Sequence, residues 1–134
     1  MVRELALSDP HGWIIAVGDN GMRQAEARRY DRFAIGIHPT AVISPSATIG
    51  EGTVVMAGAI VQAGAVIGKH VILNTNCSVD HDCTIGDYAH IAPGAVLCGN
   101  VTVGEGALIG AGAVCVPGAV IPPWSLVKAG TVAK

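Results

Sequence analysis

The most polar stretch of the sequence, residues 74–95, carries the side chains best suited to acid–base chemistry. It reads NTNCSVDHDCTIGDYAHIAPGA and places His81 between Asp80 and Asp82. A carboxylate that binds one nitrogen of an imidazole fixes its tautomer and raises the basicity of the ring. Either aspartate can do this for His81, and Asp82 is the favoured partner.

A repeat of six residues sets the elements that must position this stretch. An α-helical period of 3.6 cannot keep step with a strict six, whereas short strands joined by turns can. A small or short residue precedes each aliphatic one by two positions, so both columns face one interior. The aliphatic column is Ile43, Ile49, Val55, Val61, Ile67, Leu73, Val79, Ile85, Ile91, Leu97, Val103 and Ile109, continued by Cys115, Ile121 and Val127.

Segments such as GEGTVV, GEGALI and GAGAVCVPGAVI resemble the left-handed parallel β-helix of the hexapeptide acyltransferases. The resemblance implies an all-β fold in which three hexads close one coil, so residues 41–134 form about five coils. The left hand also comes from the resemblance, because the usual crossover rule is right-handed. Glycines that recur at the corners are expected where the backbone needs a positive φ.

Residues eighteen apart would stack, which sorts the outward side chains by face. One face carries mainly threonine and valine and is expected to contact solvent. The other two are too apolar to leave in water, so we expect them to bury against other copies of the chain, and the family resemblance implies a homotrimer. The apolar columns are Val54, Ile72, His90, Leu108 and Leu126, and Val42, Ile60, Ser78, Val96 and Val114.

The segment VILNTNCSVDHDCTIGDYAHIAPGA is similar to the NeuD-like branch of sialic acid O-acetyltransferases, which includes N-acetyltransferases of nucleotide-linked amino sugars. The resemblance implies that acetyl-CoA is the donor, that a sugar amine or hydroxyl is the acceptor, and that no metal takes part. By this resemblance His81 is the general base and Asp82 orients it. His90 lies beside the acetyl group, and Asn74 lies near the acceptor.

The remaining candidates follow from position. Asp80 is assigned to the acceptor side, while Gly99, stacked one coil after His81, leaves room for a ligand on the cofactor side. Lys128 is a candidate for the phosphates of coenzyme A. His81 lies at a corner and His90 on the opposite face, so we expect them not to meet within one chain and the site to form between subunits.

Each assignment has a plainer alternative. His81 is then a solvated corner residue, His90 packs at a subunit interface, and Asn74 is a turn residue. A covalent route through cysteine is disfavoured because most of the cysteines fall at inward positions, where the thiol behaves as a small hydrophobe. The inward ones are Cys77, Cys83 and Cys115. His70, Tyr88 and Trp124 share one corner column and are interpreted as structural.

Residues 1–40 are predicted to form a partial Rossmann-like β-α-β segment before the β-helix domain, residues 41–134. A strand is expected at Trp13–Val17 and a helix at Met22–Phe33, capped by Asp19 or Asn20. Met22, Ala25, Tyr30 and Phe33 would lie on one side of that helix. The segment contains no GxGxxG, so a phosphate loop is not indicated.

Composition narrows the function classes. A net charge of −2 with scattered basic residues gives no nucleic-acid footprint. The uncharged residues 106–127 include three prolines, which argue against a membrane span. The N-terminus has no apolar signal core, so a cytoplasmic location is expected. Two alternatives stay open, a γ-class carbonic anhydrase with histidine-bound metal and a non-catalytic trimerising module.

Overall fold

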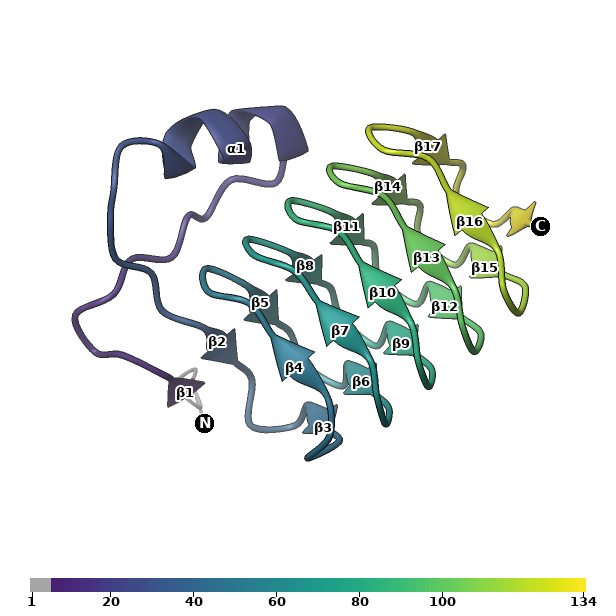
Figure 1. Ribbon diagram of the computed structural model, residues 1–134, viewed down its shortest axis with the longest axis horizontal. Helices are drawn as coiled ribbons and strands as arrows, with labels where there is room; N and C mark the ends of the chain where they lie inside the picture. Colours follow the sequence, from purple (N-terminus) through teal and green to yellow (C-terminus); the bar gives the residue numbers. More distant parts are fainter. Residues whose placement is uncertain (1–5) are drawn as a thin grey trace.

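The computed structural model describes residues 6–134 and winds most of them into a three-sided prism (Figure 1). Two-residue strands follow one another at intervals of six residues, from β3 (Val42–Ile43) to β18 (Val132–Ala133). Figure 1 shows the coils stacked along one axis, with the C-terminus at one end. The predicted six-residue period is therefore confirmed.

Three sheets form the sides of the prism. The seven-stranded sheet contains β1 (Ala6–Leu7), β2 (Gly36–Ile37), β5 (Val54–Val55), β8 (Ile72–Leu73), β11 (His90–Ile91), β14 (Leu108–Ile109) and β17 (Leu126–Val127). The five-stranded sheet contains β4 (Thr48–Ile49), β7 (Val66–Ile67), β10 (Thr84–Ile85), β13 (Thr102–Val103) and β16 (Val120–Ile121). The six-stranded sheet contains β3, β6 (Ile60–Val61), β9 (Ser78–Val79), β12 (Val96–Leu97), β15 (Val114–Cys115) and β18.

The register confirms a coil of eighteen residues. In the seven-stranded sheet His90 pairs in parallel with Ile72 on one side and Leu108 on the other. In the five-stranded sheet Thr84 pairs with Val66 and Thr102. The chain makes about five turns of the left-handed parallel β-helix of hexapeptide repeats, as expected.

The two inward columns form one continuous core. Leu73, Ile91 and Leu97 are completely buried, and the small residues between them are buried as well. Cys77 and Cys115 are part of this core, where burial raises the pKa of the Cys77 thiol to about 12 and that of Cys115 to about 11. The predicted inward orientation of Cys77, Cys83 and Cys115 is confirmed.

The corners of the prism are built on residues with positive φ. Eight of them are the predicted glycines, with φ between 64° and 74°. Six others are not glycine and were not predicted: His70, Asn76, Asp82, Tyr88, Asn100 and Trp124, with φ between 54° and 61°. Asn and Asp tolerate this conformation. His70 lies over Gly52 of the preceding coil and Trp124 over Gly106, whereas Tyr88 stacks on the ring of His70.

The N-terminal segment differs from the prediction. The helix α1 (Asn20–Ala27) has the expected cap, because the Asp19 side chain accepts a hydrogen bond from the Met22 N–H at 2.8 Å. It ends at Ala27 rather than Phe33, and it buries Arg23 and Ala27 while Met22 is 65% exposed. The expected apolar side of the helix is therefore wrong.

The strand predicted over residues 13–17 does not form. Trp13 makes a single bridge to Phe33, and within residues 6–134 no strand pairs with the residues that follow it. Within residues 6–40, β1 pairs antiparallel with β2, and β2 pairs in parallel with β5 of the prism. The division into a β-α-β segment, residues 1–40, and a β-helix domain, residues 41–134, stays a prediction, and residues 1–5 lie outside the described chain.

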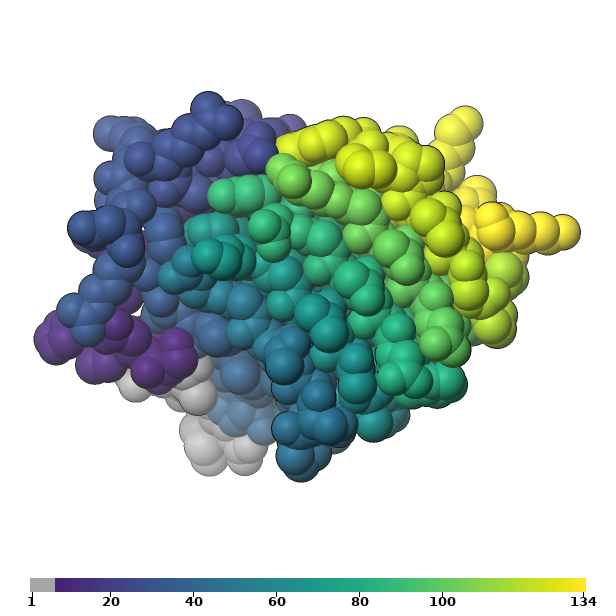
Figure 2. Space-filling model, viewed as in Figure 1, coloured from purple at the N-terminus to yellow at the C-terminus, as the bar shows by residue number. Residues whose placement is uncertain are grey.

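The outer faces differ in what covers them. The five-stranded sheet exposes threonines together with Val66 and Val120, in agreement with a solvent face. The outer side of the seven-stranded sheet is partly covered by the chain's own residues 14–18, which lie across Val54 and Ile72. We expected the apolar side chains of this face to be buried by other copies of the chain. At Val54 and Ile72, residues 14–18 of the same chain cover the face instead. Figure 2 shows the N-terminal residues against the neighbouring coils, with the C-terminal residues at the opposite end.

Among residues 6–134, no helix has both the length and the apolar character that a membrane crossing requires.

Candidate functional site

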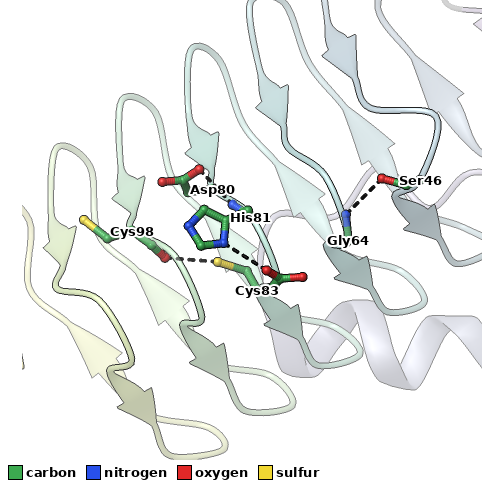
Figure 3. A network of polar contacts seen from close by, with 7 residues as sticks. Ser46, Gly64, Asp80, His81, Cys83 and Cys98 are labelled. Atoms are coloured by element: carbon green, nitrogen blue, oxygen red, sulfur yellow. Dashed lines mark hydrogen bonds and ion pairs between the residues drawn. The ribbon is translucent and has the colours of Figure 1, made fainter.

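His81 stands at the corner between β9 and β10 with its side chain exposed (Figure 3). Its Nδ1 lies 2.9 Å from Asp82 Oδ2, and its backbone N–H donates to Asp80 Oδ1 at 2.8 Å. Asp82 therefore holds the ring, and Asp80 holds the backbone of the same turn. The geometry agrees with the choice of Asp82 over Asp80 as the partner of the imidazole.

The two carboxylates raise the pKa of His81 above its ordinary value. The hydrogen bond that the ring donates to Asp82 is the largest cause, followed by the charge of Asp80. In the neutral ring, an Nδ1–H that donates to Asp82 leaves the lone pair on Nε2. Within residues 6–134, Nε2 has no hydrogen-bond partner, so it is free to accept a proton from a bound molecule.

Two glycines make room for this pair. Gly99 lies against the imidazole, and a Cβ atom there would stand 2.5 Å from His81 Nε2. Gly64, one coil before Asp82, would likewise meet Asp82 Oδ1 if it carried a side chain. Gly99 was predicted to leave space for a ligand, but the ring itself occupies that space. Gly64 was predicted as a corner glycine, but its contact with Asp82 was not, although the eighteen-residue register places the two next to each other.

A shallow cavity of about 260 Å³ opens beside this corner on the six-stranded sheet. Its polar lining comes from Gln62, Ser78, Asp80 and Cys98. Cys98 is partly exposed, and its backbone carbonyl accepts a bond from the Cys83 thiol at 3.1 Å (Figure 3). A ligand in this cavity would lie next to the carboxylate of Asp80, one residue from His81.

His90 and Asn74 meet in a second cavity. Asn74 Nδ2 lies 3.0 Å from His90 Nε2, while the Asn74 oxygen accepts from the Thr75 N–H. The cavity measures about 350 Å³ and has mostly apolar walls, formed by residues 14–18 on one side and by residues including Met56 and Ile72 on the other. Burial, followed by the charge of Arg23, lowers the pKa of His90. The Asn74 amide can donate a hydrogen bond to Nε2 only when this nitrogen carries no proton. The bond and the burial therefore both favour the uncharged form of His90.

The structure therefore brings the predicted residues together as two separate groups. His81, Asp82, Asp80 and Gly99 form one, and Asn74 and His90 form the other, with no contact between the histidines inside one chain. The separation of His81 from His90 agrees with the expectation. Lys128 joins neither group. It is exposed in the last coil, in the same stacked column as Asn74.

His70 and Tyr88 are structural, as interpreted. Their rings are stacked with centroids 5.1 Å apart, and Phe33 meets the His70 ring edge-on. His70 is 4% exposed, and burial lowers its pKa. Across residues 6–134, no three His, Cys, Asp or Glu side chains gather into a group that could hold a metal ion.

Comparison with known proteins places these features in a family context. The family model described as bacterial transferase hexapeptide (six repeats) matches residues 64–99 and 82–117. No curated protein matches the chain. Among solved structures, the acetyltransferase domain of PglB from Neisseria gonorrhoeae is 41% identical, with a TM-score of 0.90 over 92% of this chain and 62% of that one.

Two further structures are similar. PerB from Caulobacter crescentus, solved with CoA and GDP-perosamine, is 42% identical with a TM-score of 0.87 and covers 90% of this chain and 60% of that one. WeeI from Acinetobacter baumannii is 26% identical with a TM-score of 0.74 and covers 94% and 68%. The chain thus spans about three fifths of the length of the PglB and PerB chains that it matches.

The contact between Gly99 and the imidazole generates a prediction. Gly99→Ala will push the His81 ring away and break its hydrogen bond to Asp82, so the pKa of His81 will fall toward its ordinary value. A pH titration of the imidazole signals by NMR measures this. Gly21→Ala is the control, since its Cβ would meet only Asp19 Oδ1 at an ordinary 3.5 Å. An unchanged pKa of His81 in Gly99→Ala would contradict the proposed contact.

Proposed function

We propose that the chain is a hexapeptide-repeat transferase that transfers the acetyl group of acetyl-CoA to the amine of a nucleotide-linked sugar. The observation that carries the proposal is the exposed His81–Asp82 pair with a free Nε2. The similarity to PglB, which has been solved with acetyl-CoA, and to PerB, solved with CoA and GDP-perosamine, supports the donor and the class of acceptor.

The proposed reaction needs one base and no covalent enzyme intermediate. The nitrogen of the acceptor amine attacks the thioester carbonyl carbon, and His81 Nε2 takes the proton that this nitrogen loses. The C–S bond then breaks, and the sulfur of coenzyme A leaves with a proton returned by the imidazolium. Asp82 keeps Nδ1 protonated and stabilises the charged ring during the step.

Direct transfer is supported by the environment of the thiols. Cys77, Cys83 and Cys115 are buried in the core, where desolvation raises their pKa and disfavours the nucleophilic thiolate. Cys98 is the partly exposed thiol, and it lines the cavity beside Asp80. Within residues 6–134 its thiol makes no hydrogen bond to a basic side chain, so it is assigned no catalytic function.

We assign the second group of residues to the donor and acceptor. His90, neutral and half-buried, is proposed to contact the acetyl group, and Asn74 the acceptor. Asp80 is placed on the acceptor side through its cavity, Gly99 supports the ring on the cofactor side, and Lys128 is proposed to meet the phosphates of coenzyme A.

The proposed assembly is a homotrimer whose site lies between subunits. In one chain His81 and His90 do not meet, so a substrate that contacts both needs a second copy. Apolar side chains that remain exposed support an interface on two faces: Val42 and Val96 on the six-stranded sheet, and Leu126 on the seven-stranded sheet.

The activity itself is tested by thiol release from acetyl-CoA in the presence of nucleotide-linked amino sugars and their hydroxyl analogues. We expect release with the amino acceptors and a loss of about 10²–10⁴-fold in kcat/KM for His81→Ala, the usual contribution of a general base. His38→Ala, which alters a partly exposed histidine bonded to Thr40, is the matched control. No release by the wild-type chain with any acceptor would identify a non-catalytic module instead.

The pH dependence follows from the Asp82 hydrogen bond. A base must be neutral to act, so kcat/KM will rise with pH through an apparent pKa above 6.5, the ordinary value for histidine. Asp82→Asn removes the main cause of the raised pKa, so the midpoint will move down and the plateau will fall by about tenfold or more. Asp80→Asn should lower the midpoint less. A midpoint that stays in place in Asp82→Asn excludes the assigned pairing.

A shared site predicts complementation between inactive variants. His81→Ala and His90→Ala subunits, mixed one to one and reassembled, will form some interfaces that combine an intact His81 with an intact His90. In a cyclic trimer with random assembly, about one quarter of the interfaces do so, and activity will recover to about that fraction. A mixture that stays as inactive as its parents, or a monomer by light scattering, would refute the shared site.

A further inference from the structure

Arg23 is the largest fully buried side chain of the molecule, with 1% of its surface exposed. Buried charges are normally paired with a carboxylate. The Arg23 guanidinium instead donates to the backbone of two successive coils. Its Nε lies 2.8 Å from the His70 carbonyl oxygen, and its Nη2 lies 2.6 Å from that of Tyr88. The fork thus bridges two corners that are eighteen residues apart.

The same guanidinium also holds the segment that precedes α1. Nη1 donates to the carbonyl oxygens of Val17 at 3.0 Å and Gly18 at 3.1 Å, and Nη2 donates to Asn20 Oδ1 at 2.8 Å. Asn20 in turn donates to the Gly106 carbonyl at 3.0 Å. One side chain therefore joins residues 17–20 to the stacked corners of the prism.

This attachment lies at the wall of the His90 cavity. Residues 14–18 form that wall, and Gly18 and His90 both line the cavity. Over residues 6–134, no backbone-to-backbone hydrogen bond holds any residue from Ile14 to Gly18. A further cavity, of about 250 Å³, lies on the other side of the segment, where Glu26 and Tyr30 also line it. Ile15 of the segment is buried, while the carbonyls of Val17 and Gly18 are bound by Arg23, so the Arg23 contacts decide where the backbone of these two residues lies.

We propose that Arg23 is a positioning residue that closes the His90 cavity by clamping residues 17 and 18 to the corners at His70 and Tyr88. The cavity wall, rather than the strands alone, then defines the apolar space beside His90 and Asn74. This inference rests on the proposed function in one respect, that the cavity receives the reacting groups. That Arg23 fixes residues 17 and 18 at the cavity wall can be tested whether or not the protein is an enzyme.

The chemistry of the fork makes the residue type specific. Five N–H donors in one plane reach carbonyls from three directions, whereas a lysine ammonium is a single point with three donors on a flexible stem. Arg23→Lys keeps the positive charge and loses the bridging geometry. This one substitution therefore separates the effect of the positive charge at position 23 from the effect of the bridging hydrogen bonds.

The test compares Arg23→Lys with Arg29→Gln, which alters an exposed arginine two residues after the end of the same helix. Imidazole titration by NMR reports His90. We expect its pKa to rise in Arg23→Lys because water enters the cavity, while that of His81 stays unchanged. Cleavage within residues 14–18 by a broad-specificity protease should accelerate at least tenfold. In turnover, KM for acetyl-CoA should rise more than kcat falls.

Asn20→Ala is the second variant, and it decides the matter if circular dichroism shows that Arg23→Lys has not folded. It removes the amide that ties the guanidinium to the Gly106 corner and should shift the same readouts in the same direction. Wild-type titration and cleavage in the folded variants would overturn the proposal. If His90 and the protease respond but no variant or wild-type chain acetylates a sugar, the clamp stands and the proposed function falls.

Discussion

Every corner of this prism from residue 52 to residue 130 needs one residue with positive φ, and corners eighteen residues apart lie on top of one another. These two conditions together decide where a large side chain can stand. A corner residue with a side chain must have a small neighbour in the adjoining coil, as Asp82 has in Gly64. Asp82, whose carboxylate holds His81, therefore has a backbone conformation that most residue types avoid. It has it at a corner where the glycine of the neighbouring coil leaves room for the side chain. The site is a consequence of how the coil turns its corners.

The two histidines of the site region have opposite surroundings on one scaffold. His81 is exposed between two carboxylates, which raise its pKa, whereas burial and the charge of Arg23 lower that of His90. The difference between the two pKa values follows from position in the hexad. His81 stands at a corner, open to water, and His90 lies on a strand whose outer face is covered by the chain itself.

In the N-terminal segment, a buried arginine binds backbone carbonyls that a neighbouring strand would bind in a sheet. Residues 14–18 have the β-branched composition of a strand, yet no ladder forms along them within the described chain. Their carbonyls are bound instead by Arg23, whose guanidinium is satisfied by backbone oxygens and lies in surroundings that lower its pKa to about 10. Helix periodicity alone assigned Met22 and Tyr30 to the buried side. The clamp rotates α1 so that Arg23 and Ala27 face the prism.

The six-residue period by itself determined the spacing of the strands and the two inward columns, because a strict repeat leaves one way to bury both columns. The closing of three hexads into one coil came from the family resemblance, and the eighteen-residue register, the small neighbours of His81 and the separation of His81 from His90 follow from it. The tertiary structure shows Asp82, the partner that the sequence favoured, on the ring, and it alone decided that Asp82 adopts a positive φ, that Gly99 lies against the imidazole, and that residues 14–18 form the wall of the His90 cavity. These features depend on side-chain direction and on contacts between distant segments, and neither leaves a periodic signal in the sequence.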